Sequence, residues 1–242
     1  MKPIALFSLI AASLTATTWV SVAAQGAPST GAADSLIVAE LFTSQGCSSC
    51  PPAERLFSSL AEKENLLTIE WHVDVWDSLV HGGSRWKDPY SKEDFTDRQR
   101  AYNLAIRGKN GVYTPQAVIN GQLEGVGSRT SEVNYMLETT PSLPVSVQIK
   151  NDKVVVDASG EVADVLFVRL LEKHETDVKG GENKGRMLSG KNIALNASVL
   201  GQTGGKAIEF KLPSVGEGET CAVIVQRHDE EIGPPLGAAK CA

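Results

Sequence analysis

Two cysteines separated by two serines, Cys47-Ser48-Ser49-Cys50, lie where a predicted strand meets a predicted helix. The preceding run, Ser35–Phe42, is almost continuously apolar, which is typical of a buried strand. Pro51 and Pro52 follow the second cysteine and suit the first turn of a helix. Unpaired N–H groups and the helix dipole at such a turn stabilise a thiolate, the form of cysteine that attacks disulfides. The chain therefore contains a strand–turn–helix unit that favours thiol–disulfide exchange.

Residues 1–24 are predicted to be a signal peptide rather than part of the fold. Lys2 precedes an apolar run from Ile4 to Val20, and Val22-Ala23-Ala24 resembles a small-residue cleavage site. An apolar run of this length also permits an uncleaved membrane anchor. In both cases the protein is exported, and we expect it in a bacterial periplasm or outside the cell, where disulfides persist.

The charge balance excludes several classes of partner. The chain has 23 lysine and arginine residues against 29 acidic residues, a net charge of -6. It offers no basic stripe for nucleic acid and no cationic cluster for an anionic membrane surface. The hydrophobic content of 42% is that of an ordinary soluble protein, and the length allows one large domain or two small ones.

The first half of the chain alternates between strand-like and helix-like segments. Residues 25–34 are rich in small residues and are expected to be a flexible lead-in to a domain spanning 35–140. In that domain, Asn120-Gly121 separates two short apolar runs and predicts a hairpin. The expected order is strand, helix, strand, helix, hairpin and helix, which calls for a mixed α/β sheet with helices on both faces. The predicted helices span 52–65, 91–107 and 130–139.

The second half, residues 141–242, is predicted to be a β-rich domain. Short strand-like runs are separated by turn-rich segments and few helical stretches occur. This pattern predicts an antiparallel sheet or a small sandwich. The predicted strands span 145–150, 154–158, 165–174, 207–212 and 221–226.

Two further cysteines, Cys221 and Cys241, lie in this β-rich half. Four cysteines allow three pairings, and the spacing favours Cys47 with Cys50 and Cys221 with Cys241. A Cys221–Cys241 disulfide would close a loop of about 20 residues and stabilise the fold by about 3 kcal/mol in the loop-entropy picture. It would act as a structural staple; the alternative is a relay that exchanges electrons with the first pair.

The first half resembles the thioredoxin superfamily. The resemblance depends on Cys47-Ser-Ser-Cys50, on Thr114-Pro115 before the predicted hairpin, and on the element order between them. It implies that Pro115 follows a cis peptide bond and that the backbone beside it pairs with a substrate polypeptide. Longer segments resemble an uncharacterised bacterial family of secreted thioredoxin-like proteins, catalogued as a domain of unknown function. These segments are Glu40–Pro52, His72–Asp77, Arg98–Tyr102, Tyr113–Gln116 and Gly181–Arg186.

The resemblance also implies roles for individual residues. Cys47, at the exposed edge of the helix, would be the nucleophile, and Cys50, one turn in, would be the buried resolving thiol. Glu40 would be the buried acid that moves the proton of Cys50, although it stands one position away from the acid of thioredoxins. The alternative for Glu40 is a strand-end carboxylate in solvent or paired with a lysine. Ser48 and Ser49 do not indicate whether the protein oxidises or reduces its substrates.

Other chemistry has weaker support in the sequence. A zinc site needs about four ligands, and no second Cys-x-x-Cys or histidine pair completes one, so no metal or cofactor is expected. His72 and His81 could suggest a metal, but a lone strand histidine is more often an ordinary core or surface residue. Arg98 is read as part of a solvated helix face. The loop 75–90 would lie near Cys47 and shape a substrate groove, or serve packing alone.

Two functions follow from this pattern, and a third, metal delivery through Cys47 and Cys50, is disfavoured because further ligands are missing. The first is an exported dithiol–disulfide oxidoreductase that acts on polypeptide substrates or a redox partner. The second is a non-catalytic binding or assembly module in which the Cys47–Cys50 bridge is structural. The sequence leaves the oligomeric state open.

Overall fold

The fold comes from a computed structural model that describes residues 36–228 and 232–241. The signal peptide predicted for 1–24, the possible membrane anchor in it and the lead-in predicted for 25–34 lie outside these residues. Within them, no helix combines the length and the apolar character needed to cross a membrane.

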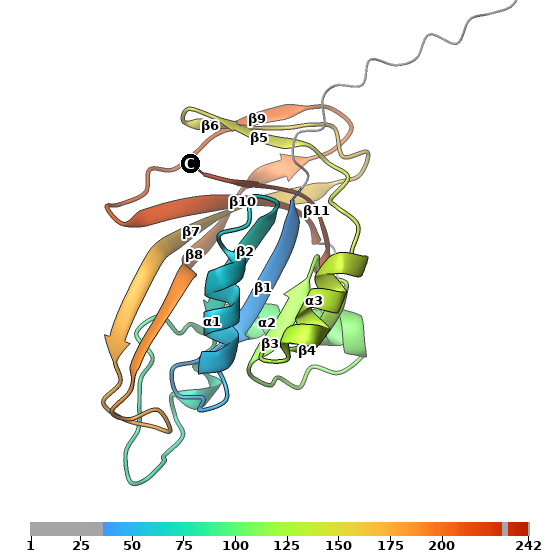
Figure 1. The fold of residues 1–242 in the computed structure, drawn as a ribbon. Helices are drawn as coiled ribbons and strands as arrows, with labels where there is room; N and C mark the ends of the chain where they lie inside the picture. The colour runs from blue at the N-terminus through green and yellow to red at the C-terminus, as the bar shows by residue number, and fades with distance from the viewer. Residues whose placement is uncertain (1–35, 229–231, 242) are drawn as a thin grey trace, which may run out of the picture. The chain divides into compact units, whose positions relative to one another are not determined.

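One mixed sheet contains most of the strands. Its eight strands are β1 (Ile37–Thr43), β2 (Leu66–His72), β3 (Gln116–Ile119), β4 (Leu123–Val126), β7 (Ala163–Asp177), β8 (Met187–Thr203), β10 (Glu219–His228) and β11 (Ile232–Lys240). Their order across the sheet is β11-β10-β7-β8-β2-β1-β3-β4 (Figure 1). β1 and β2 are parallel, whereas β1 and β3 are antiparallel.

The remaining elements are a small sheet and three helices. The small sheet is antiparallel, in the order β5-β6-β9, and consists of β5 (Val147–Lys150), β6 (Lys153–Val156) and β9 (Ile208–Lys211). The helices are α1 (Pro51–Leu60), α2 (Glu93–Arg107) and α3 (Thr130–Thr139), with a 3₁₀ turn η1 (Asp74–Trp76). In the described residues the protein is thus a mixed α/β structure dominated by strands.

The alternation of side chains along β1 places helices on both faces of the sheet. Successive side chains of a strand point to opposite faces. Ala39 and Leu41 belong to a core with residues of α1 and α3, whereas Val38 and Phe42 belong to a core with residues of α2. Accordingly, α1 and α3 cover one face and α2 covers the other (Figure 1).

The hairpin predicted at Asn120-Gly121 joins β3 to β4. Both residues have positive φ, 46° and 61°, as a type I′ turn requires. A side chain at Gly121 would place its Cβ 2.9 Å from Pro235 and 3.0 Å from Tyr102, so only glycine fits there. The Asn120 side chain accepts a hydrogen bond from Val38 N at 2.7 Å and ties the turn to β1.

The β-rich half contributes to both sheets. Four of its strands (β7, β8, β10 and β11) extend the sheet that β1 and β2 begin, and β2 joins β8 through the pair Glu70 and Ile193. The sequence predicted no strand over Met187–Thr203, where β8 lies. Strands from both sides of residue 140 thus share one sheet, and the division into two domains at that point stays a prediction.

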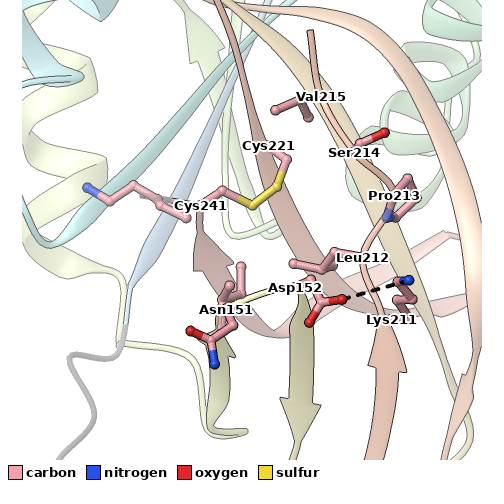
Figure 2. Close-up of a pocket in the computed structure, with 11 residues that line it drawn as sticks. Asn151, Asp152, Lys211, Leu212, Pro213, Ser214, Val215, Cys221 and Cys241 are labelled. Carbon is pink, nitrogen blue, oxygen red and sulfur yellow. Dashed lines mark ion pairs between the residues drawn. A yellow bond between two sulfur atoms is a disulfide. The ribbon is translucent and has the colours of Figure 1, made fainter.

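A disulfide joins Cys221 on β10 to Cys241, just after β11. It borders an open hollow of about 900 Å³ beside the small sheet (Figure 2). Lys240 Nζ contacts the carbonyl oxygen of Lys63 beyond the C-terminal end of α1, whereas Cys50 caps its N-terminal end. A helix of ten residues is about 15 Å long. The two disulfides therefore lie near opposite ends of α1, and a relay between them would have no direct sulfur contact.

Candidate functional site

A second disulfide, Cys47–Cys50, begins α1. The Cα atoms of the two cysteines are 5.5 Å apart, and Cys50 is the N-cap residue of the helix. Pro51 occupies the first helical turn, where the missing proline N–H is not needed. β1 ends at Thr43, so the turn 44–50 sets the disulfide at the positive end of the α1 dipole.

The burial of Cys47 differs from the sequence prediction. Cys47 was expected at an exposed edge, but both cysteines are 0% exposed, and only Ser48 and Ser49 between them face solvent. The prediction of an exposed Cys47 is wrong because a segment far along the chain covers the turn.

The covering segment is the connection 178–186 between β7 and β8, here called the strap. Asn183 is fully buried, and its Nδ2 donates to the carbonyl oxygens of Gln45 and Cys47, both at 2.9 Å. Ser48 N donates to Glu182 Oε2 at 2.8 Å. The strap therefore satisfies backbone groups of the cysteine turn that would otherwise bind water.

Two tryptophans of the loop after β2 also contact the cysteine turn. Trp86 Nε1 donates to Gln45 Oε1 at 3.1 Å, and a side chain at Gly46 would place its Cβ 3.0 Å from Trp76. A hollow of about 170 Å³ lies between this loop, the turn and the strap. Leu79 and Val80, which line it, are about half exposed. The loop expected to shape a groove near Cys47 thus contacts the cysteine turn.

The Thr114-Pro115 peptide bond is cis and lies beside the cysteine turn. Ser49 Oγ is 3.5 Å from the carbonyl oxygen of Thr114 and 3.3 Å from Cys47 Sγ. Trp76 Nε1 donates to Thr114 Oγ1 at 2.8 Å and fixes this edge. The fold therefore brings together Cys47, Cys50, Thr114 and Pro115.

Glu40 lies on the other face of the sheet, with α2. Its side chain is fully buried and accepts hydrogen bonds from Arg98 Nε at 2.7 Å, Arg98 Nη2 at 3.0 Å and Tyr102 OH at 2.6 Å. Cys50 begins the helix of the opposite face. The contacts of Glu40 are those of a buried ion pair, and Arg98 is not part of a solvated face as the sequence suggested.

A different acid, Glu54, lies one helical turn beyond Cys50 and was missed in the sequence. Residues four apart share a helix face, and the Glu54 side chain is buried against the sheet with Thr43 Oγ1 donating to it at 2.7 Å. Burial raises the pKa of Glu54, although the charge of His72 and the Thr43 hydrogen bond oppose the shift. The spacing from Cys50 was the signal that could have found it.

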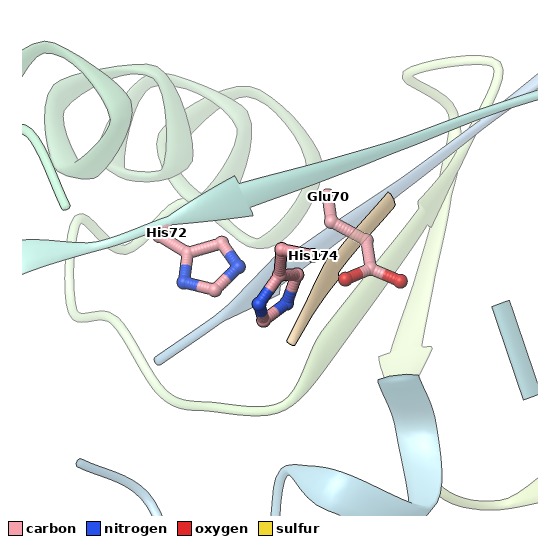
Figure 3. Close-up of side chains that lie close together, drawn as sticks. All are labelled: Glu70, His72 and His174. Carbon is pink, nitrogen blue, oxygen red and sulfur yellow. The ribbon is translucent and has the colours of Figure 1, made fainter. Parts of the chain in front are cut away.

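One group of side chains with closely spaced metal-ligand atoms was also missed. Among residues 36–228 and 232–241, Glu70, His72 and His174 form the one group of three whose ligand atoms all lie within 4.8 Å of one another (Figure 3). All three are buried. The sequence pattern gave no hint of Glu70 or His174, because they lie on β2 and β7, which flank β8 only in the folded sheet.

Comparisons with known proteins give a family but no reaction. A comparison with curated proteins finds no match. A crystal structure of a protein from Agrobacterium tumefaciens, determined by the Northeast Structural Genomics Consortium, is similar with a TM-score of 0.70 and 29% sequence identity. The similarity covers 85% of this chain and 93% of that one. Residues 38–226 match the family described as protein of unknown function (DUF1223). The chain belongs to this DUF1223 family.

Proposed function

We propose that the protein is an exported thiol–disulfide oxidoreductase and that Cys47–Cys50 is its redox-active disulfide. The observation that carries the proposal is the position of this disulfide, at the N-terminus of α1 and beside the cis Thr114-Pro115 edge. If the first half works as thioredoxins do, the backbone at this edge pairs with a substrate polypeptide. The helix N-terminus would stabilise whichever cysteine leaves as a thiolate.

The exchange proceeds through a mixed disulfide. A substrate thiolate attacks Cys47 Sγ, a new sulfur–sulfur bond forms, the Cys47–Cys50 bond breaks, and Cys50 leaves with the electron pair. A second thiolate of the substrate then attacks the mixed disulfide and releases Cys47 as a thiolate. The substrate is oxidised to a disulfide and the cysteine pair is reduced to two thiols. The reverse sequence reduces a substrate disulfide, and the Ser48-Ser49 pair leaves the direction open.

Glu54, rather than Glu40, is the acid suited to the proton of Cys50. Its raised pKa keeps a proton on the carboxyl to a higher pH than in an ordinary glutamate. The carboxyl lies on the same helix and face as Cys50, one turn further along. It can donate its proton as Cys50 leaves and take it back when the disulfide re-forms. Glu40 keeps the role of a buried partner for Arg98.

Access to Cys47 requires movement of the strap, since the cysteine has no exposed surface. A substrate would displace the Glu182–Ser48 hydrogen bond first, because that contact is exposed, whereas the Asn183 contacts are buried. The exposed side chains of Leu79 and Val80 offer an apolar surface for a polypeptide next to the disulfide. Polypeptides of the periplasm or the extracellular space are the substrate class that agrees with the predicted signal peptide.

A second candidate is a non-catalytic binding module with a structural Cys47–Cys50 bridge. The complete burial of both cysteines favours it. A structural bridge needs no substrate access, and the strap would then only stabilise the turn. The two candidates differ in the redox potential and in the reactivity of Cys47.

Equilibration in graded glutathione buffers, followed by alkylation and mass spectrometry, separates the two candidates. A redox-active pair has a potential above about −300 mV, whereas a structural disulfide lies below it. The Cys221–Cys241 disulfide is an internal reference, and we expect it to stay oxidised where Cys47–Cys50 is already reduced. A Cys47–Cys50 potential as low as that of the reference would refute the oxidoreductase proposal.

Trapping tests the order of attack. Cys50→Ser leaves Cys47 without its resolving partner and is expected to accumulate mixed disulfides with exported polypeptides. Cys47→Ser is the matched control and should trap far fewer. Equal trapping by the two variants would show that Cys47 is not the attacking sulfur.

A further inference from the structure

A buried polar cluster lies on the face of the sheet that α1 covers. Glu70 and His72 alternate along β2 with side chains of the α2 face, and His174 reaches the same place from β7 (Figure 3). Glu70 and His72 are 0% exposed and His174 is 6% exposed. Burial of three such groups together is costly unless something satisfies them.

The polar atoms that face one another in this cluster have no hydrogen-bond partner. Both carboxyl oxygens of Glu70, the Nε2 atom of His72 and the Nε2 atom of His174 are buried without a hydrogen bond of good geometry. The backbone N–H of Lys191 lies near the Glu70 carboxyl, but it does not satisfy either oxygen. Nearly all buried polar atoms of folded proteins have a partner, so four such atoms at one place point to a ligand that they share.

The other nitrogen of each imidazole is already engaged. His72 Nδ1 lies 2.7 Å from Asp88 Oδ2, and His174 Nδ1 lies 3.2 Å from Thr176 Oγ1. Asp88 is held in turn by the backbone N–H groups of Gln45 and Tyr90. A carboxylate on one imidazole nitrogen fixes the ring and leaves the lone pair on the other, as at histidine ligands of metal ions.

From these contacts we infer that Glu70, His72 and His174 bind a divalent transition-metal ion, with zinc as the best match. Their ligand atoms lie within 4.8 Å of one another. A tetrahedral zinc ion would draw these atoms closer together, until each lay about 2.0–2.2 Å from the metal. Two imidazoles and one carboxylate leave a fourth position open, which is the ligand pattern of catalytic zinc sites. Imidazole ligands favour transition metals over magnesium or calcium.

Gly190 on β8 makes room for this set. A side chain there would place its Cβ 2.5 Å from Glu70 Oε2 and 3.0 Å from His174 Nε2. Gly190 pairs with His174 across the two strands, so the ligand atoms lie directly over its backbone. Of the ordinary residues, only glycine lets both ligands converge at this point.

The cysteines contribute no ligand to the site, so its test does not require that the Cys47–Cys50 pair be redox-active. The metal site is tested on full-length, tag-free protein in which both disulfides are formed, so that no thiol competes for the ion. Isothermal titration with Zn²⁺ alone, and metal analysis after dialysis, should give one bound ion per chain. Glu70→Gln and His174→Gln should each lower the affinity by more than about 100-fold, beyond the usual effect of losing an outer-shell partner.

His81→Gln is the matched control, because His81 is 62% exposed and lies outside the cluster. It should bind Zn²⁺ like the unchanged protein. Absence of a bound equivalent, or equal affinity in the Glu70, His174 and His81 variants, would overturn the site and leave buried water or a shared proton to explain the unpaired atoms.

A measurement on the unchanged protein keeps the test decisive if a variant fails to fold. Co²⁺ in a four-coordinate nitrogen and oxygen site absorbs in the visible range, and Zn²⁺ should abolish that absorption by displacement. An absent visible band, together with no Zn²⁺ uptake, would likewise overturn the inference.

Discussion

Replacing Arg98 with methionine is expected to lower the free energy of unfolding by about 3–5 kcal/mol, the usual cost of removing one partner of a buried ion pair. The Arg98 guanidinium donates two hydrogen bonds to Glu40, whose side chain is fully buried. Its Nη2 also contacts Tyr102 OH and Gln226 Oε1, both at 3.0 Å. Methionine fills similar space but leaves the Glu40 carboxylate with Tyr102 OH alone.

Urea unfolding of the oxidised protein, followed by tryptophan fluorescence, measures this loss. With a slope of about 3 kcal/mol/M, the upper end of the usual range, the midpoint should fall by about 1–1.7 M. Arg100→Met is the matched control on the same helix. Arg100 is 45% exposed and pairs with Asp97 on the surface, so its replacement should change the free energy by no more than about 0.5 kcal/mol.

The double variant Glu40→Met/Arg98→Met isolates the uncompensated charge. If the cost of Arg98→Met is mainly that of a stranded carboxylate, removal of both charges should restore most of the stability. A double variant as unstable as the sum of the single variants would refute this reasoning. The same series tests Glu40 as the acid of the redox reaction, because a purely structural Glu40 leaves the Cys47–Cys50 potential nearly unchanged.

Three further predictions concern the surroundings of the Cys47–Cys50 disulfide. Burial raises the pKa of Glu54, so the folded protein holds that proton to a higher pH than the unfolded chain does. The free energy of unfolding therefore falls as the pH rises above about 4.5. In paired urea titrations, Glu54→Gln should exceed the parent protein in stability by more at pH 8 than at pH 4. Asn183→Ala removes the two buried hydrogen bonds of the strap and should speed reduction of the Cys47–Cys50 disulfide by dithiothreitol about tenfold. This factor corresponds to about 1.4 kcal/mol less free energy for opening the strap. The reduction rate of the Cys221–Cys241 disulfide should not change. Asp88→Asn should weaken Zn²⁺ binding by about 10–100-fold in calorimetry while both disulfides stay intact.

The local features of the first half were predictable because short-range chemistry decides them. The apolar run before Cys47, the prolines after Cys50 and the Asn120-Gly121 turn each specify a backbone conformation from a few neighbouring residues. These were enough to predict a mixed α/β sheet with a hairpin. β8 was missed because its polar and small residues, including Gly190, break the alternation that marks a strand.

The environment of the site was not predictable, because residues distant in the sequence create it. The strap that buries Cys47 comes from the connection between β7 and β8, and its Asn183 reaches back to the cysteine turn. His174 joins Glu70 only through the pairing of strands across the sheet. Glu40 was assigned from a resemblance, but its register on β1 directs it to α2, and a shift of one residue along a strand changes the face.

Asp88 connects the disulfide to the inferred metal site. A single oxygen, Oδ2, accepts hydrogen bonds from Gln45 N at 2.8 Å and from the His72 ring at 2.7 Å. Gln45 lies two residues before Cys47, and its carbonyl oxygen is held by Asn183 of the strap. An ion on His72 Nε2 would fix the ring and strengthen its hold on Asp88, so the cysteine turn and the strap would be fixed as well. Coupling between two sites is reciprocal: if the ion stabilises the closed turn, then opening the turn to a substrate weakens the hold on the ion by the same factor.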